Sequence, residues 1–450
     1  MSGPERRLAG FVAGLEWAAL PDPVRDEARR LFADTLGVTV AGSRDPDIPP
    51  LARESGRMHP GPAPIVGTEW STTPVRAALA NGISSAVLEL NAGHKYAAGH
   101  PVVQYLPALL ADSVANPTTP EAFLAAHVAG YEASARVGRA SVPLAPGYHP
   151  FGVWGTVGAA AAVARHRGFD ERRTLAAIQL AANRAQHTRL EAISEGESGA
   201  RNGPVGFSNV DGLLAADLAE AGFGGITHGI ERHLESTTRD GADRELLADR
   251  LGEHWEIRRG YYKRHSAGRL AHPAIEAVCQ LLEEADITSD EVASIQVETF
   301  EKAATWLDNP APTNRFQAKT SIPFAVATVI ANGTSGPSAF DESALTEGTL
   351  SLAERVQLSV DPSIDARVPE SRGARVRLEL ADRRQSSAYV PHADGGPNAP
   401  YTTAELEAKF ERLVEPVLGT DRARALWNGA MALPESDPGR LYRSTGTEPE

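Results

Sequence analysis

The spacing of apolar residues changes near Trp255, and this change limits the folds open to the chain. The preceding residues are rich in alanine, and their apolar side chains recur with the 3.6-residue period of amphipathic helices, as over residues 24–42. Residues 295–299 and 376–380 instead alternate between apolar and polar, which is typical of half-buried strands. Residues 274–284, which precede these two segments, have the apolar spacing of a helix. The sequence therefore predicts a helical region followed by an α/β region.

Local signals mark the ends of several expected elements. Thr119 precedes a proline and an acid, a combination that caps and opens a helix. Thr402 and Glu405 have the spacing of a capping box, which predicts a last helix near the C-terminus. Residues 391–400 (PHADGGPNAP) have the composition of a loop. The polar tail from Glu435 is expected to fray.

The charge balance limits the classes of partner. A chain of 450 residues suits two or three domains. Its 44 Lys and Arg against 58 Asp and Glu give a net charge of −14, which argues against nucleic acid and anionic membrane. The longest apolar stretches reach about half of the roughly 20 residues that a membrane span needs, and the N-terminus lacks a signal-peptide pattern. We expect a cytoplasmic location.

The chain has one cysteine, Cys279, and this count excludes several chemistries. An intramolecular disulfide, a cysteine-rich zinc site and a four-iron cluster on thiolates of one chain all need more. The six-residue spacing of His94 and His100 does not suggest a metal site, and we predict none. Phosphate-binding, dinucleotide-binding, HExxH and GxSxG motifs are absent from the sequence.

Residues 89–101 (ELNAGHKYAAGHP) form the densest polar segment. It contains Glu89, His94 and His100, punctuated by glycines, and histidine is the usual proton carrier near neutral pH. A pocket loop is one interpretation, and a solvated loop that caps a helix is the other.

Two further segments are rich in glycine. Residues 147–152 (GYHPFG) present Tyr148 and His149 at a turn that enters a helix of small residues, where backbone amides favour carboxylates. Residues 195–209 (EGESGARNGPVGFSN) are predicted to be a loop with one cation, Arg201, whose fork matches a carboxylate. A packing turn and a surface arginine are the respective alternatives.

The fourth segment, residues 261–273 (YYKRHSAGRLAHP), lies where the helical region gives way to the α/β region. Its chemistry-bearing residues include Lys263, His265, Arg269 and His272. Ligand sites favour such junctions between domains. A cationic surface strip is the alternative interpretation.

These segments, in this order, resemble the MmgE/PrpD family, which includes 2-methylcitrate dehydratase, cis-aconitate decarboxylase and iminodisuccinate epimerase. The resemblance covers nearly the whole chain. Its motifs are LFADTLGVTVAG (31–42), the segment from Asn81 to Pro101, GYHPFGVWGTVGAAAA (147–162), YYKRHSAGRLAHPAIEA (261–277), QAKTSIPFAVA (317–327) and PHADGGPNAPYTTAELEAKF (391–410).

The resemblance implies an architecture and an assembly. A large all-helical domain, residues 1–260 and 395–450, is built from both ends of the chain. A smaller α/β lid domain, residues 261–394, is inserted between them. The family forms homodimers, needs no metal or organic cofactor, and binds a small carboxylated substrate between the domains.

The resemblance also carries site residues across, position by position. The positions that match are Glu89, His100, His149, Lys263, Arg269 and His272. The chain departs from the family at Ala92, where an acid is usual, at Arg201, where a lysine is usual, and at Gly268, where a histidine or cysteine is usual. Arginine rarely gives up its proton, so Arg201 is expected to hold a carboxylate rather than act as an acid or base.

We therefore expect a cofactor-independent lyase, foremost a dehydratase, that abstracts a proton beside a carboxylate. The expected catalytic residues are His100, His149, Lys263 and Glu89. The expected substrate-binding residues are Arg201, Arg269, Tyr148, His94, His265 and His272. An epimerase or double-bond isomerase of the same family is one alternative, and a catalytically inactive binding or assembly subunit is another.

Overall fold

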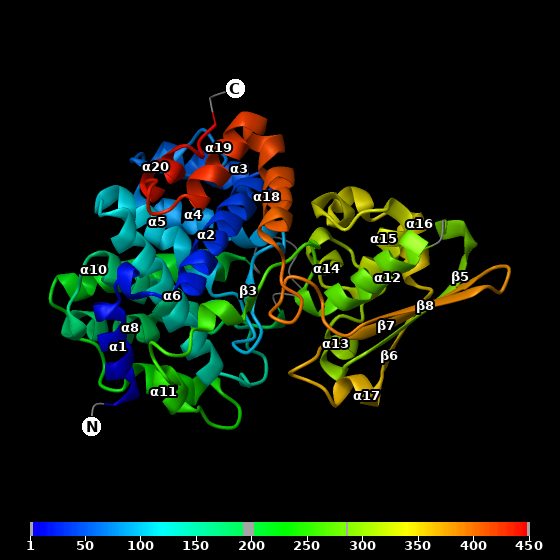
Figure 1. The fold of residues 1–450 in the computed structure, drawn as a ribbon, viewed down its shortest axis with the longest axis horizontal. Coiled ribbons are helices and arrows are strands. Elements are labelled where there is room, and N and C mark those ends of the chain that lie inside the picture. The colour runs from blue at the N-terminus through cyan, green and yellow to red at the C-terminus, as the bar shows by residue number, and fades with distance from the viewer. Residues whose placement is uncertain (1–2, 192–201, 285–286, 448–450) are drawn as a thin grey trace.

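A larger helical part lies beside a smaller α/β part (Figure 1). The structure is a computed structural model, and it describes residues 3–191, 202–284 and 287–447. The chain is thus mainly helical with a smaller α/β part, as the change in apolar spacing predicts.

The larger part combines helices from both ends of the chain. They are α1 (Pro4–Gly14), α2 (Asp22–Gly42), α3 (Ile48–Met58), α4 (Pro74–Val87), α5 (Leu106–Ala115), α6 (Pro120–Ala140), α7 (Gly155–His166), α8 (Glu171–Arg184), α10 (Gly203–Glu220), α11 (Gly229–Thr237), α18 (Thr403–Leu418), α19 (Thr420–Met431) and α20 (Pro438–Arg443). A short hairpin of β1 (Ala63–Pro64) and β2 (Ser71–Thr72) accompanies them. Within the described residues, no helix combines the length and the apolar character needed to cross a membrane.

Small residues let α7 pack between α6 and α10. A Cβ added at Gly158 would lie 1.6 Å from the Ser134 Oγ of α6, and one added at Gly212 of α10 would lie 2.3 Å from the Cβ of Ala159. The alanine-rich sequence of α7 therefore has a packing role, because larger side chains would hold these helices apart.

The helices near the C-terminus pack against helices near the N-terminus. The capping box predicted at Thr402 and Glu405 is confirmed, and it opens α18. This helix packs on α2, where Lys409 Nζ lies 2.6 Å from Asp34 Oδ1 and donates to Leu90 O at 3.0 Å. Both charged groups are buried, so they stabilise the contact only as a pair.

The tail is more ordered than its composition predicts, and the expectation of fraying from Glu435 is wrong for α20. Tyr442 of this helix is fully buried. Its hydroxyl donates to Pro64 O at 2.5 Å and accepts from Asn81 Nδ2 at 3.0 Å. One buried aromatic with satisfied hydrogen bonds is enough to dock a short polar segment.

The smaller part consists of short helices and one sheet. Its helices are α12 (His272–Glu284), α13 (Glu301–Trp306), α14 (Arg315–Ala318), α15 (Ile322–Asn332), α16 (Glu347–Ala353) and α17 (Pro362–Asp365). Its strands are β5 (Val292–Thr299), β6 (Val356–Val360), β7 (Ala374–Leu380) and β8 (Gln385–Val390).

The sheet has the strand order β6-β5-β7-β8. The edge strand β6 is parallel to β5, and the other neighbouring strands are antiparallel. Val297 of β5 lies opposite Val376 of β7. Along β5 and β7, buried and more exposed residues largely alternate, which confirms the predicted half-buried strands. Helices α12 and α15 contact the sheet (Figure 1).

Two separate clusters of buried apolar residues correspond to the two parts. The first cluster contains apolar residues of the helices in the larger part; along the chain it extends to Tyr262, and it begins again at Tyr401. The second lies between Ala267 and Val390. The chain therefore passes between two cores at two places, and the exact domain limits stay a prediction.

The loop predicted over residues 195–209 is wrong for its last part. Helix α10 begins at Gly203, with Pro204 in its first turn, so the glycines there belong to a helix start. Arg201 lies outside the described residues.

Candidate active site

The junction between the two parts brings together two segments that are far apart in the sequence. Strand β3 (Gly93–His94) pairs with β4 (Gly260–Tyr261), so Gly93 lies opposite Tyr261. A Cβ added at Gly93 would lie 2.4 Å from the Tyr261 hydroxyl, so only glycine allows this approach. The pairing places the polar segment 89–101 beside the cationic segment 261–273.

Glu89 and Lys263 form a buried ion pair at this junction. Lys263 Nζ donates to Glu89 Oε2 at 2.9 Å, and the side chains are 0% and 3% exposed. Glu89 follows α4 with a φ of 54°, a left-handed conformation that is uncommon for a residue other than glycine. Strained backbone and buried charge both cost free energy, and such features concentrate at functional sites.

His100 and His149 lie on different loops, and the rings of both pack near Phe151. The His100 ring lies 5.5 Å from that of Phe151, and the His149 ring lies 4.6 Å from it. The Tyr261 ring is 6.2 Å from the His100 ring. Both predicted histidines therefore share one aromatic neighbourhood next to β4.

Hydrogen bonds select different tautomers for the neutral forms of these two rings. His100 Nδ1 lies 3.1 Å from Ala92 O, and since a carbonyl only accepts, Nδ1 donates and Nε2 carries the lone pair. His149 Nδ1 accepts from the Phe151 backbone N–H at 3.3 Å, so its Nε2 carries the proton. In their neutral forms, the two rings therefore differ in which nitrogen carries the proton.

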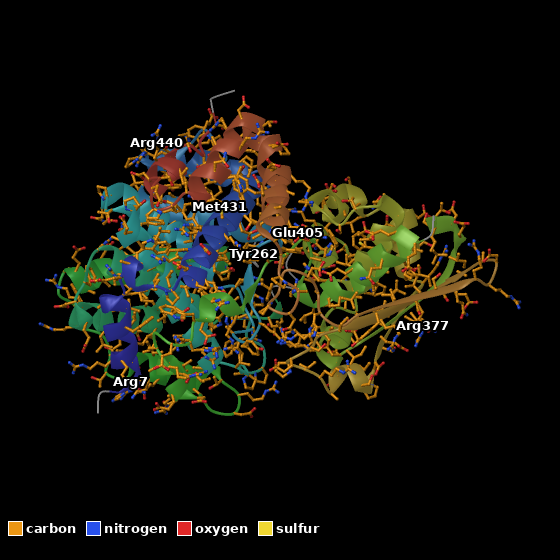
Figure 2. The ribbon with its side chains drawn as sticks, in the orientation of Figure 1. Arg7, Tyr262, Arg377, Glu405, Met431 and Arg440 are labelled. Atoms are coloured by element: carbon orange, nitrogen blue, oxygen red, sulfur yellow. The ribbon has the colours of Figure 1, made fainter. Side chains whose placement is uncertain are left out.

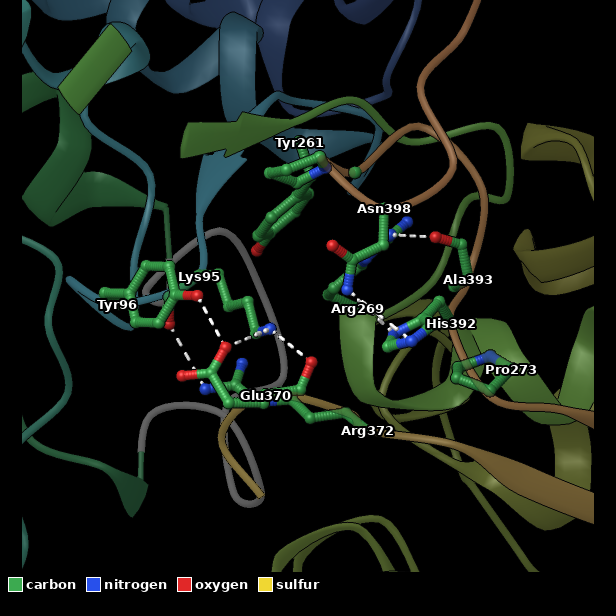
Figure 3. Close-up of a pocket in the computed structure, with 12 residues that line it drawn as sticks. Lys95, Tyr96, Tyr261, Arg269, Pro273, Glu370, Arg372, His392, Ala393 and Asn398 are labelled. Atoms are coloured by element: carbon green, nitrogen blue, oxygen red, sulfur yellow. Dashed lines mark hydrogen bonds and ion pairs between the residues drawn. The ribbon is translucent and has the colours of Figure 1, made fainter. Parts of the chain in front are cut away.

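A pocket opens beside this group, at the junction of the two parts. It encloses about 590 Å³, open solvent included. Its lining residues are Lys95, Tyr96, Tyr261, Arg269, Pro273, Glu370, Arg372, His392, Ala393, Gly396, Pro397 and Asn398. In Figure 3 the Tyr261 ring points from its strand into the space between Lys95 and Arg269. Burial raises the pKa of the Tyr261 phenol to about 12, so this group stays protonated near neutral pH.

Arg269 lines the pocket, but it is engaged mainly with the loop that follows β8. Its Nη1 donates to Asp394 O at 2.8 Å and its Nη2 donates to Ala393 O at 2.7 Å. The guanidinium also lies over the Tyr261 ring, 4.7 Å from its centroid. Arg269 therefore shapes the pocket wall and gives it positive potential.

His94 does not line the pocket. Its ring is fully buried, with Nδ1 accepting from Ala97 N at 3.0 Å and Nε2 lying 3.1 Å from Glu256 Oε2. Burial opposes ionisation of Glu256, but His94, Arg139 and Arg259 outweigh it and lower the pKa of this carboxyl to about 2. Both ring nitrogens of His94 thus face protein groups, which holds β3 in place.

His265 and His272 are also buried behind the pocket wall, and burial lowers the pKa of both. His265 Nδ1 lies 2.6 Å from Ser335 Oγ. Potential ligand atoms of His265, His272 and Glu276 lie within 4.8 Å of one another. However, Arg269 Nη1 is 3.4 Å from His272 Nδ1, and a guanidinium so close opposes a divalent cation.

Tyr148 lies apart from the pocket lining. It forms an isolated bridge with Arg189, and its ring lies 5.4 Å from that of His187. The structure therefore pairs Glu89 with Lys263, packs His100 and His149 near Phe151, and places Arg269 in the adjoining pocket.

Sequence reasoning missed several pocket residues. Lys95 and Tyr261 lie inside segments that the sequence singles out, next to more obvious histidines. Arg372 and Glu370 lie before β7, where no motif marks them. The nearby cis Val368–Pro369 bond cannot be recognised in the sequence either. Only the contacts of Glu370 and Arg372 with Lys95 and Tyr96 reveal these two residues.

Comparison with known proteins identifies the group to which this architecture belongs. The chain belongs to the MmgE/PrpD family: residues 6–235 match the MmgE/PrpD N-terminal domain, and residues 265–433 match the MmgE/PrpD C-terminal domain. This confirms the resemblance found in the sequence.

Two curated relatives have related names. The chain is 25% identical over 461 residues to the cis-aconitate decarboxylase-like protein oryM of Aspergillus oryzae, a match that covers 95% of this chain and 94% of that protein. It is also 25% identical over 232 residues to the cis-aconitate decarboxylase of Homo sapiens, which covers 48% of this chain and 46% of that protein. The family and these relatives support an enzyme of the lyase type.

Proposed function

We propose that this chain dehydrates a small carboxylated substrate by removing a proton from the carbon beside a carboxylate. The observation that carries the proposal is the difference in tautomer between His100 and His149, whose rings both pack near Phe151. Dehydration needs one base for the carbon acid and one acid for the leaving hydroxyl, and the two imidazoles supply both near neutral pH.

The proposed reaction divides the proton transfers between the two rings. His100 Nε2 takes the proton from carbon, and the electron pair left behind forms the carbon–carbon double bond. His149 Nε2–H gives its proton to the departing hydroxyl, which leaves as water. Reprotonation of His149 and deprotonation of His100 by solvent restore the starting state.

Positive charge at the junction supports the developing negative charge. Lys263 is held in its site by the buried Glu89 carboxylate, and a fixed cation in a water-poor site stabilises an enolate-like charge strongly. Arg269 adds positive potential from the pocket wall. This set requires no metal and no organic cofactor for the proposed steps.

Decarboxylation is a second candidate, because both curated relatives carry the name of a cis-aconitate decarboxylase or a protein like it. In that reaction a carbon–carbon bond breaks, carbon dioxide leaves, and one acid protonates the carbon. His149 would suffice as this acid, and no base for a carbon-bound proton would be needed.

Product analysis in D₂O separates these reactions. We would incubate the protein with hydroxylated and unsaturated di- and tricarboxylates, and follow them by proton NMR and ultraviolet absorbance. Dehydration gives a new alkene band and an alkene proton signal, whereas decarboxylation releases carbon dioxide. Deuterium exchange without net product would instead indicate an epimerase or isomerase. No conversion and no exchange across the panel would contradict both candidates.

A further inference from the structure

Arg372 is a half-buried pocket cation whose guanidinium is largely unused. Its Nη2 donates to Lys95 O at 3.2 Å, and this is its one hydrogen bond within residues 3–191, 202–284 and 287–447. No carboxylate oxygen of these residues lies within ion-pair distance of it, whereas Arg375 and Arg377 on the following strand both pair with Glu298. Most of the five N–H donors of Arg372 therefore have no acceptor among the residues that the structure describes, and they suit a ligand.

The surroundings of Arg372 carry excess positive charge. Burial and the neighbouring Arg269 both disfavour its charged form and lower its pKa. Arg269 itself donates hydrogen bonds to the carbonyl oxygens of Ala393 and Asp394. Lys95 adds a third cation in the pocket wall. A cluster of like charges of this kind is stabilised when an anion enters it.

Among the pocket-lining residues that the structure describes, Glu370 is the one carboxylate, and it lies at the rim. Its Oε2 accepts from the Tyr96 hydroxyl at 2.9 Å and lies 3.8 Å from Lys95 Nζ. The side chain is 75% exposed, and an exposed pair contributes only about 0–1 kcal/mol. In Figure 3 this carboxylate meets Lys95 and Tyr96 on the opposite side from His392. An anion that binds Lys95 and Tyr96 more tightly would therefore displace the Glu370 carboxylate with little loss of free energy.

We propose that Arg372 determines specificity by binding a carboxylate of the substrate remote from the reacting carbon, and that this carboxylate displaces Glu370 from Lys95 and Tyr96. The fork of an arginine matches a carboxylate with two parallel hydrogen bonds. Tyr261 lines the same pocket, and its ring lies 6.2 Å from that of His100, so a ligand bound at this subsite lies near the proposed base. The identification of this ligand as the substrate rests on the proposed function.

The test uses two substitutions with opposite expected effects. Tricarballylate, a saturated tricarboxylate without a hydroxyl to lose, is titrated into the full chain by calorimetry. We expect Arg372→Gln to weaken its binding about 10- to 100-fold, the loss of a charge-assisted bidentate pair. We expect Glu370→Gln to strengthen binding, because it removes the competing carboxylate. Arg377→Gln serves as the matched control, because it removes an arginine charge from β7 of the same α/β part (Figure 2), where Arg377 pairs with Glu298.

The opposite signs separate a binding role from damage to the fold, because a structural defect would weaken binding in both variants. Arg372→Lys, which keeps the charge and loses the fork, should give an intermediate affinity. The melting temperature of each variant without ligand reports on folding. Wild-type affinity in Arg372→Gln, weaker binding in Glu370→Gln, or no binding of tricarballylate to the wild type would each overturn the proposal.

A kinetic measurement keeps this inference separate from the proposed function. Calorimetry needs no turnover, so its result stands even if no substrate is dehydrated. With a substrate that is turned over, Arg372→Gln should raise KM about 10- to 100-fold and leave kcat nearly unchanged, since the interaction is remote from the reacting carbon. A large fall in kcat at unchanged KM would contradict a role in specificity.

Discussion

At the scale of single residues, one hydrogen bond to each of two histidines selects the tautomer of its neutral ring. His100 Nδ1 donates to a carbonyl, and His149 Nδ1 accepts from a backbone amide. If His100 is the base, His100→Ala should lower kcat by about 10²-fold or more, measured with the substrate that NMR identifies. His228→Ala changes an exposed histidine and should leave kcat unchanged. An undiminished kcat in His100→Ala would remove this residue from the mechanism.

The buried pair of Glu89 and Lys263 makes a second prediction at this scale. Lys263→Met should destabilise the fold by about 3–5 kcal/mol, because a buried carboxylate would lose its counter-ion. Adding Glu89→Gln should restore much of the stability without restoring activity. Urea unfolding monitored by circular dichroism measures both effects. Equal stability of the single and double variants would show that the two charges are not coupled.

At the scale of elements, close packing of small residues determines how α6, α7 and α10 meet. Gly158→Ala should destabilise the protein by about 1–3 kcal/mol, because the new Cβ would clash with Ser134 Oγ. Gly14→Ala, at the end of α1 where a Cβ meets nothing within 4 Å, is the control. Thermal unfolding compares the two, and similar melting temperatures would argue against the close approach of α7 to α6.

Element boundaries were predicted best where the signal is local. The capping box at Thr402 and Glu405 needs only residues within one helical turn, so the sequence contains the whole determinant. The docking of Tyr442 was missed because its partners Pro64 and Asn81 lie more than 300 residues earlier. The predicted loop over 195–209 was partly wrong because glycine and proline also open helices.

At the scale of the whole molecule, buried histidines should make stability depend on pH. Burial lowers the pKa of His127 from 6.5 to about 4. Between these values the unfolded chain binds a proton that the folded chain does not, so stability falls as pH decreases from about 6.5 to 4. Each such group contributes a slope of up to about 1.4 kcal/mol per pH unit. His94, His233 and His265 are shifted in the same direction.

Replacement of one buried histidine checks this origin. His127→Gln should reduce the pH dependence of the unfolding free energy between pH 6.5 and 4 by about one proton, measured by urea unfolding at several pH values. Its stability at pH 7 should fall, because contacts with Tyr105 and Ala28 change. An unchanged slope would mean that His127 is protonated in the folded state.

The homodimer implied by the resemblance stays a prediction.

The sequence by itself determined the mainly helical class with a smaller α/β part, several helix starts and the family, because apolar period, capping and motif order are properties of neighbouring residues. It also selected Glu89 and Lys263, which form a buried pair, and His100 and His149, whose rings both pack near Phe151; their catalytic roles stay a prediction. Only the tertiary structure decided which nearby groups face the pocket. His94 is buried against Glu256, while Arg372 lines the pocket, because packing across two hydrophobic cores places residues that are hundreds of positions apart.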